Sequence, residues 1–108
     1  MRRRVRVEPS GLEFEMHAGE TIMGAATRLG YRWPTVCGGQ ADCGVCALEV
    51  MDAPVPLPPP SAVEQERLDA LPETRRYPDR RYRLACQLQA PAGFDILVVH
   101  KRGVASIA

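Results

Sequence analysis

The hydrophobic pattern of the first thirty residues predicts a β-hairpin followed by a short helix. Residues 3–7 alternate between charged side chains and valine, and residues 12–16 alternate between apolar and acidic side chains. A period of two is typical of strands with one buried face, and Pro9-Ser10-Gly11 supplies turn chemistry between them. From Thr21 to Leu29 the apolar positions follow the 3.6-residue period of a helix, which we expect to end at Gly30.

The later apolar segments predict three more strands and a stiff connector. Residues 47–51, 82–88 and 96–99 have the apolar content and length of strands. Residues 54–60 are mostly proline, so they can neither form a helix nor donate the backbone hydrogen bonds of a central strand. We expect this proline segment to be an extended connector.

A capping motif predicts a second helix directly after the proline segment. Ser61-Ala62-Val63-Glu64 matches the capping box, in which the Ser61 side chain accepts a bond from the Glu64 amide and Glu64 reaches back. We expect this helix to run to about Leu71 and to stop at Pro72. Its acidic side chains, which we expect on the outward side, are Glu64, Glu66, Asp69 and Glu73. A solvated face and a docking role both explain them.

Length and charge indicate one domain with no general affinity for polyanions. The chain has 108 residues, 45% apolar and 25% charged, so we expect a single domain over residues 1–108. The net charge of +1 and the absence of a recognition motif argue against a nucleic-acid partner. The cations cluster locally, at Arg75, Arg76, Arg80, Arg81 and Arg83. Solubility, an acidic partner and pairing with the acidic helix each explain this cluster.

The sequence predicts neither a targeting signal nor a membrane segment. Acidic residues at 8, 13 and 15 interrupt the sequence before any apolar run long enough for a signal peptide. No stretch approaches the roughly 20 apolar residues that a membrane helix needs. We therefore expect a cytoplasmic protein, in which cysteines serve as metal ligands or reactive thiols more often than as disulfides.

The spacing of the four cysteines favours an iron–sulfur cluster. Five residues separate Cys37 from Cys43, two separate Cys43 from Cys46, and 39 separate Cys46 from Cys86. A structural zinc site more often has two short Cys-x-x-Cys pairs, and this chain has one. A loop that curls over a binuclear cluster can supply three thiolates while a distant strand supplies the fourth. Glycines at 38, 39 and 44 would let backbone amides approach the cluster sulfurs.

Two segments resemble the [2Fe-2S] ferredoxins of the β-grasp fold: CGGQADCGVC at residues 37–46 and RLACQ at residues 83–87. The resemblance implies an α+β fold, with a mixed sheet, a short helix packed across it and a cluster-binding loop. It also implies a [2Fe-2S] cluster held by Cys37, Cys43, Cys46 and Cys86. The first spacing of five residues is similar to that of bacterial branches rather than the plant type.

The function that this resemblance implies is one-electron transfer between partner proteins. The partners would be a flavin-dependent ferredoxin reductase and an acceptor oxidoreductase, such as a cytochrome P450 or a ring-hydroxylating oxygenase. We expect a monomer that docks transiently and is not itself an enzyme, because no catalytic constellation is recognisable in the sequence. The alternatives are a cluster-based redox sensor and a zinc-binding interaction module. Trp33, shortly before the first cysteine, is expected to pack over the loop as part of the core.

Overall fold

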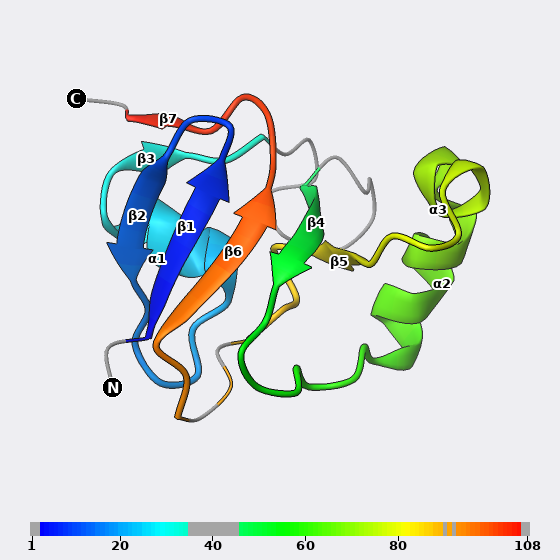
Figure 1. The fold of residues 1–108 in the computed structure, drawn as a ribbon, viewed down its shortest axis with the longest axis horizontal. Coiled ribbons are helices and arrows are strands. Elements are labelled where there is room, and N and C mark those ends of the chain that lie inside the picture. The colour runs from blue at the N-terminus through cyan, green and yellow to red at the C-terminus, as the bar shows by residue number, and fades with distance from the viewer. Residues whose placement is uncertain (1–2, 35–45, 90, 92, 107–108) are drawn as a thin grey trace.

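A five-stranded mixed sheet forms the centre of the protein (Figure 1). The computed structural model describes residues 3–34, 46–89, 91 and 93–106. The strand order is β2-β1-β6-β4-β5, in which β1 and β6 are parallel and the other neighbours are antiparallel. The strands are β1 (Arg4–Glu8), β2 (Leu12–Glu15), β4 (Ala47–Asp52), β5 (Tyr82–Leu84) and β6 (Ile96–His100).

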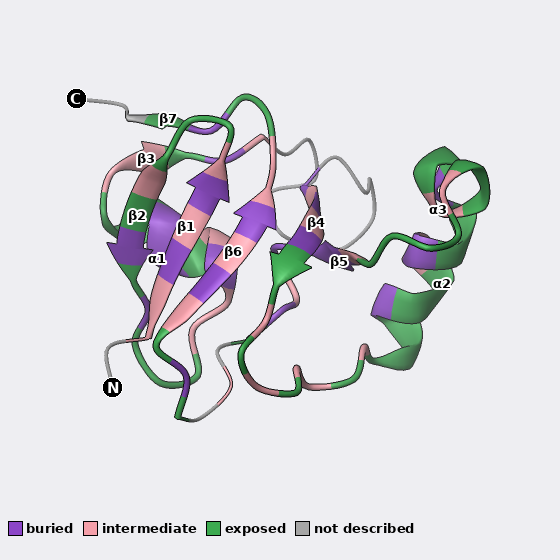
Figure 2. Ribbon diagram, in the orientation of Figure 1, coloured by how far each residue is buried: buried purple, intermediate pink, exposed green. Residues whose placement is uncertain are grey.

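The structure confirms the opening hairpin that the alternating sequence pattern predicts. Val5 and Val7 are fully buried, while their charged neighbours on β1 are only half-buried. Phe14 on β2 lies opposite Val5 in the antiparallel register, so both side chains reach the same core. The buried bands across β1 and β6 in Figure 2 follow this period of two.

The first helix, α1 (Ile22–Arg28), is also as expected and covers one face of the sheet behind β1 and β2 (Figure 1). The Thr21 hydroxyl caps it by accepting a 3.0 Å bond from the Gly24 amide. Its buried side chains are Ile22, Ala25 and Ala26. Gly30 follows with a φ of +84°, a left-handed conformation that glycine adopts without strain.

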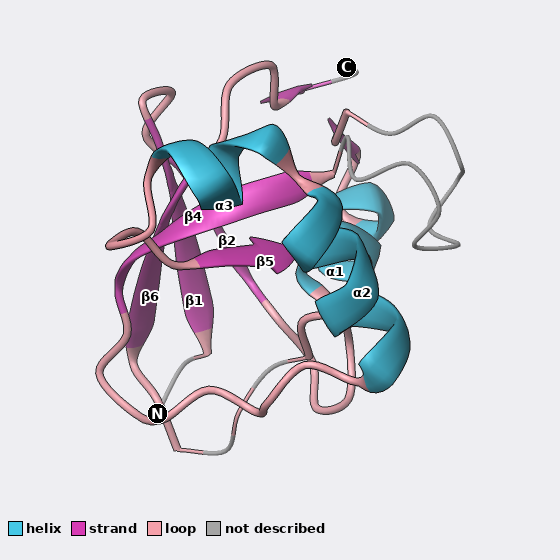
Figure 3. Cartoon of the chain, turned by 90° about the vertical axis from the view of Figure 1, so that its right-hand side faces the viewer, coloured by secondary structure: helices cyan, strands magenta, loops and turns pink. Residues whose placement is uncertain are grey.

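The helical segment after the proline connector differs in part from the expectation. Residues 54–60 contain neither helix nor strand, and α2 (Ala62–Ala70) follows them. The helix ends before Pro72 as expected, but Pro72 then begins a second short helix, α3 (Pro72–Arg76). Proline is favoured in the first turn of a helix because no amide is needed there. Figure 3 shows α3 in front of β4, and α2 beside the end of β5 and in front of α1.

Two features of the sequence interpretation are corrected by the structure. Glu64 does not face outward, because its side chain is 1% exposed, whereas Glu66, Asp69 and Glu73 are exposed. The strand expected over residues 82–88 ends at Leu84, and Cys86 lies in the turn that follows.

A second, two-stranded sheet was not expected from the sequence. It pairs β3 (Tyr31–Arg32) with β7 (Ala105–Ser106) in antiparallel register. Two-residue strands carry too short a pattern to be recognised. None of the helices in the described ranges has the length and apolar content needed to cross a membrane.

Candidate metal centre

Two of the four cysteines lie side by side in the described part of the chain. Cys46 directly precedes β4, and Cys86 lies two residues after β5. The antiparallel register places Ala47 opposite Leu84, and it thereby joins two cysteines that are separated by 39 residues in the sequence. The Cys46 Sγ to Cys86 Sγ distance is 3.4 Å, well beyond the about 2.05 Å of a disulfide bond.

The separation and environment of this thiol pair suit two ligands of one metal ion. A tetrahedral ion with metal–sulfur bonds of about 2.3 Å holds its thiolates about 3.8 Å apart. The observed 3.4 Å therefore needs only a small adjustment. Cys46 is fully buried and Cys86 is 7% exposed, so solvent is largely excluded from both sulfurs. Soft, buried thiolates are the donors that iron–sulfur clusters use.

The backbone of Cys46 is held by hydrogen bonds from two directions. The Trp33 indole Nε1 donates to the Cys46 carbonyl oxygen at 3.1 Å, and the Ala85 amide donates to the same oxygen at 3.4 Å. Trp33 is 4% exposed, which confirms the expectation that it packs as core. Trp33, which precedes the expected cluster loop, thus contacts Cys46, which directly precedes β4.

The turn that carries Cys86 is fixed at both ends. The Gln87 and Leu88 amides donate to the Leu84 carbonyl at 3.0 and 2.9 Å, and the Met23 amide of α1 donates to the Ala85 carbonyl at 3.0 Å. The Gln87 side-chain Nε2 also lies 3.7 Å from the Cys86 sulfur, as a donor to it. The sequence analysis names Gln87 only as part of the RLACQ motif and assigns it no role. Its position next to Cys86 could have indicated a contact with the cysteine sulfur.

A buried ion pair fastens α2 to β5 close to this turn. The Arg83 Nε and Nη2 donate to the two Glu64 carboxylate oxygens at 2.8 and 3.0 Å, and the Leu84 amide donates to Glu64 Oε2 at 3.0 Å. Arg83 Nη1 donates to the Pro58 carbonyl at 2.6 Å. Pairing between the arginine cluster and the acidic helix is therefore confirmed for Arg83. The other four arginines of the cluster are exposed.

The other half of the expected site lies outside the described residues. Cys37, Cys43 and the three glycines of the expected loop fall within residues 35–45, of which the structure gives no description. Within the described ranges, no group of three or more histidine, cysteine or acidic side chains is arranged to hold a metal ion. The described geometry therefore places two of the four expected ligands together.

A mixed sheet, a helix across it and a buried thiol pair at one end define a small metal-binding α+β domain. Residues 5–91 match the family model of the 2Fe-2S iron-sulfur cluster binding domain, and the chain belongs to this family. It is a ferredoxin-type electron carrier with a [2Fe-2S] cluster and the β-grasp fold, as the sequence resemblance implied. No match was found among curated proteins.

Solved structures of ferredoxins are similar over nearly the whole chain. The ferredoxin of Rhodopseudomonas palustris HaA2 is 29% identical, with 93% of this chain and 94% of that chain covered and a TM-score of 0.63. A chain of the covalent putidaredoxin reductase–putidaredoxin complex is 25% identical, with coverages of 90% and 95% and a TM-score of 0.67. A reduced putidaredoxin variant from Pseudomonas putida is 24% identical, with coverages of 90% and 93% and a TM-score of 0.64.

Proposed function

We propose that this ferredoxin accepts single electrons from a flavin-dependent ferredoxin reductase and passes them to an acceptor oxidoreductase. The acceptor we infer is an oxygenase, either a cytochrome P450 or a ring-hydroxylating enzyme. The observation that carries the proposal is the buried Cys46–Cys86 pair, two soft thiol donors of the kind that iron–sulfur clusters use. The similarity to a chain from a reductase–putidaredoxin complex supports the choice of electron donor.

The ligands in this proposal are Cys37, Cys43, Cys46 and Cys86. The bound cluster supplies a reversible one-electron change without bond making on a substrate. The chain contributes the thiolates, the exclusion of water from Cys46 and Cys86, and the surface that partners recognise. The protein in this proposal is therefore not an enzyme itself.

We further propose that residues 1–108 form one domain that works as a cytoplasmic monomer. The radius of gyration of 12.8 Å is close to the about 13 Å expected for one domain of 100 residues. A monomer suits a carrier that must leave one partner before it meets the next. A reducing compartment keeps the four ligands as thiols before the cluster is inserted.

The decisive experiment is anaerobic purification followed by spectroscopy and metal analysis. We expect a coloured protein with two irons and two sulfides per chain and an electron paramagnetic resonance signal after one-electron reduction. Stopped-flow mixing with a flavin-dependent reductase should then show repeated reduction and reoxidation. A colourless protein with one zinc per chain would identify the interaction module instead. Partner affinity that changes with oxidation state, without turnover, would identify the redox sensor.

The fourth ligand is tested by replacing Cys86 with serine. The Cys86→Ser variant should lose the native visible spectrum and most of its iron, because the hydroxyl is a much poorer donor than a thiolate. Gln89→Ser, at an exposed position three residues later, is the matched control and should keep full iron content. Normal cluster content in Cys86→Ser would refute the assignment of this ligand.

A further inference from the structure

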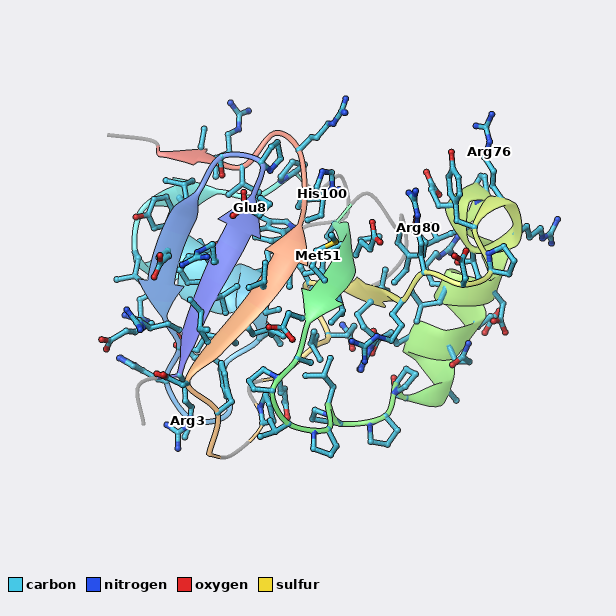
Figure 4. All side chains as sticks on the ribbon, viewed as in Figure 1. Arg3, Glu8, Met51, Arg76, Arg80 and His100 are labelled. Carbon is cyan, nitrogen blue, oxygen red and sulfur yellow. The ribbon has the colours of Figure 1, made fainter. Side chains whose placement is uncertain are left out.

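A groove of about 640 Å³ lies between α3 and the adjoining part of the sheet. Its apolar and aromatic lining comes from Ala47, Leu48, Leu71, Pro72, Tyr77 and Tyr82. Its basic lining comes from Arg80, His100, Lys101 and Arg102, and its acidic lining from Glu49 and Glu73. Figure 4 shows Arg80 between β5 and α3, His100 at the end of β6, and Arg76 on α3.

The groove adjoins both elements that position the described cysteines. Ala47 directly follows Cys46, and Tyr82 begins the strand that leads to Cys86. A partner seated in this groove would therefore contact the strands that carry the metal centre. Such a position favours short electron-transfer distances between two docked proteins.

Positive charge is concentrated around the groove. The cations of the groove and of residues 72–81, which we call the α3 segment, are Arg75, Arg76, Arg80, Arg81, Lys101 and Arg102. The carboxylates in the same region are Glu49, Glu73 and Asp79. This region carries a net +3, and because the whole chain carries +1, the remainder carries −2. Such a charge asymmetry orients an acidic partner before contact.

Arg80 is held in place at the centre of this charge. Its guanidinium lies 4.1 Å from the centroid of the Tyr77 ring, and its Nε lies 3.9 Å from Glu49 Oε2. A hydrogen bond with Tyr82 raises the pKa of Arg80 above its usual value. Because aromatic and acidic neighbours already orient this cation, it loses little side-chain freedom when it binds a carboxylate.

Helix α2 offers fewer acidic side chains for partner docking than its sequence suggests. Glu64 is buried and occupied by Arg83, so it cannot contact a partner. Only Glu66 and Asp69 remain as exposed acids on α2, and the Asp69 carboxylate accepts a 2.8 Å bond from Gln65. The arginines of the α3 segment, by contrast, are exposed.

We propose that this groove docks an acidic loop of the redox partner, with Asp or Glu side chains flanking one apolar side chain. The carboxylates would pair with Arg80 and Arg102, and the apolar side chain would contact the lining formed by Leu71, Pro72 and Tyr82. This inference deepens the proposed function and rests on it, because it assigns a docking surface to the electron carrier. Electrostatic complementarity of this kind sets the rate of encounter and the choice of partner.

The test uses a defined acidic peptide, acetyl-Glu-Glu-Leu-Glu-Glu-amide, added to the oxidised, cluster-loaded protein. We expect perturbed amide resonances in groove residues in two-dimensional NMR spectra, and weaker binding at high salt. Arg102→Glu should lower the affinity about tenfold, since it replaces an attractive pair with a repulsive one. The matched control is Arg32→Glu, an exposed site outside the groove lining with the same change in charge.

The outcomes separate specific docking from general attraction and from failure of the proposed function. Equal weakening by Arg32→Glu and Arg102→Glu would overturn the groove assignment, and so would equal binding of the lysine analogue of the peptide. Arg80→Gln, which removes the positive charge but keeps a polar side chain at this site, should weaken binding in the same direction as Arg102→Glu. Peptide binding does not depend on electron transfer, so cluster content and reductase kinetics report on the proposed function separately.

Discussion

At the scale of single residues, the side chain next to the fourth expected ligand has a direct electrostatic role. The Gln87 amide Nε2 lies 3.7 Å from the Cys86 sulfur and donates toward it. A donor aimed at a thiolate stabilises negative charge on that sulfur. Reduction adds one negative charge to the cluster, so this donor favours the reduced form and raises the reduction potential.

Replacing Gln87 with leucine should therefore lower the reduction potential. A hydrogen bond worth about 1 kcal/mol corresponds to about 40 mV for a one-electron couple, which is the upper end of the expected shift. Spectroelectrochemical titration of the loaded protein measures it. Gln89→Leu is the control, because Gln89 is exposed and should leave the potential unchanged. An unaltered potential in Gln87→Leu would mean that this amide does not act on the sulfur.

The cysteine spacing predicted the kind of cofactor but not the contacts that tune it. The resemblance at residues 37–46 and 83–87 is a local signal, and the family comparison confirms the cluster that it implied. The role of Gln87 depends on the turn over residues 85–87, which directs its amide back to the preceding side chain. A strand at Cys86, as expected from the apolar pattern, would have directed neighbouring side chains to opposite faces.

At the scale of secondary-structure elements, the Glu64–Arg83 pair joins α2 to β5. Both side chains are buried, and their contacts include the Leu84 amide and the Pro58 carbonyl. The pair therefore ties the helix, the proline segment and the strand before Cys86 into one unit. Removing one member of a buried ion pair leaves an uncompensated charge.

Glu64→Gln should lower the free energy of unfolding by about 3 kcal/mol, because Arg83 would remain buried without a counter-charge. Denaturant unfolding of the loaded protein, followed by circular dichroism, measures the change. Glu66→Gln, on the exposed side of the same helix, should shift stability by less than about 0.5 kcal/mol. If the two variants had equal stability, the pair would be of no energetic importance. The double variant Glu64→Leu with Arg83→Met should recover part of the loss.

Elements with a strong local signal were predictable, and those that depend on distant partners were not. The hairpin and α1 follow periodic patterns, β4 and β6 have the apolar content and length of strands, and the structure confirms all four. The burial of Glu64 depends on Arg83, 19 residues away, and helical charge patterns alone place such a residue in solvent. Pro72 stops α2 as its sequence predicts, and it also begins α3, because proline is favoured in the first turn of a helix.

At the scale of the whole molecule, the proposed ligands lie on segments that are far apart in the sequence. Cys46 directly precedes β4, and Cys86 follows β5. The Trp33 indole donates a hydrogen bond to the Cys46 carbonyl and so connects the end of the first third of the chain to Cys46. The hairpin of β1 and β2 is stabilised instead by the pairing of these two strands with each other and by the pairing of β1 with β6. Metal ligation should therefore stabilise the two parts of the molecule unequally.

Removal of the cluster with a chelator under reducing conditions should lower the free energy of unfolding by more than about 3 kcal/mol, because ligation energy is folding energy in a site that unfolding destroys. Hydrogen exchange should show the largest loss of protection at residues 47–50 and 84–88. The amides of β1 serve as the internal control, since their partners on β2 and β6 lie outside the ligand segments. Equal loss of protection in β1 and at residues 84–88 would show that the cluster stabilises the fold as one cooperative unit, rather than mainly the strands that carry its ligands.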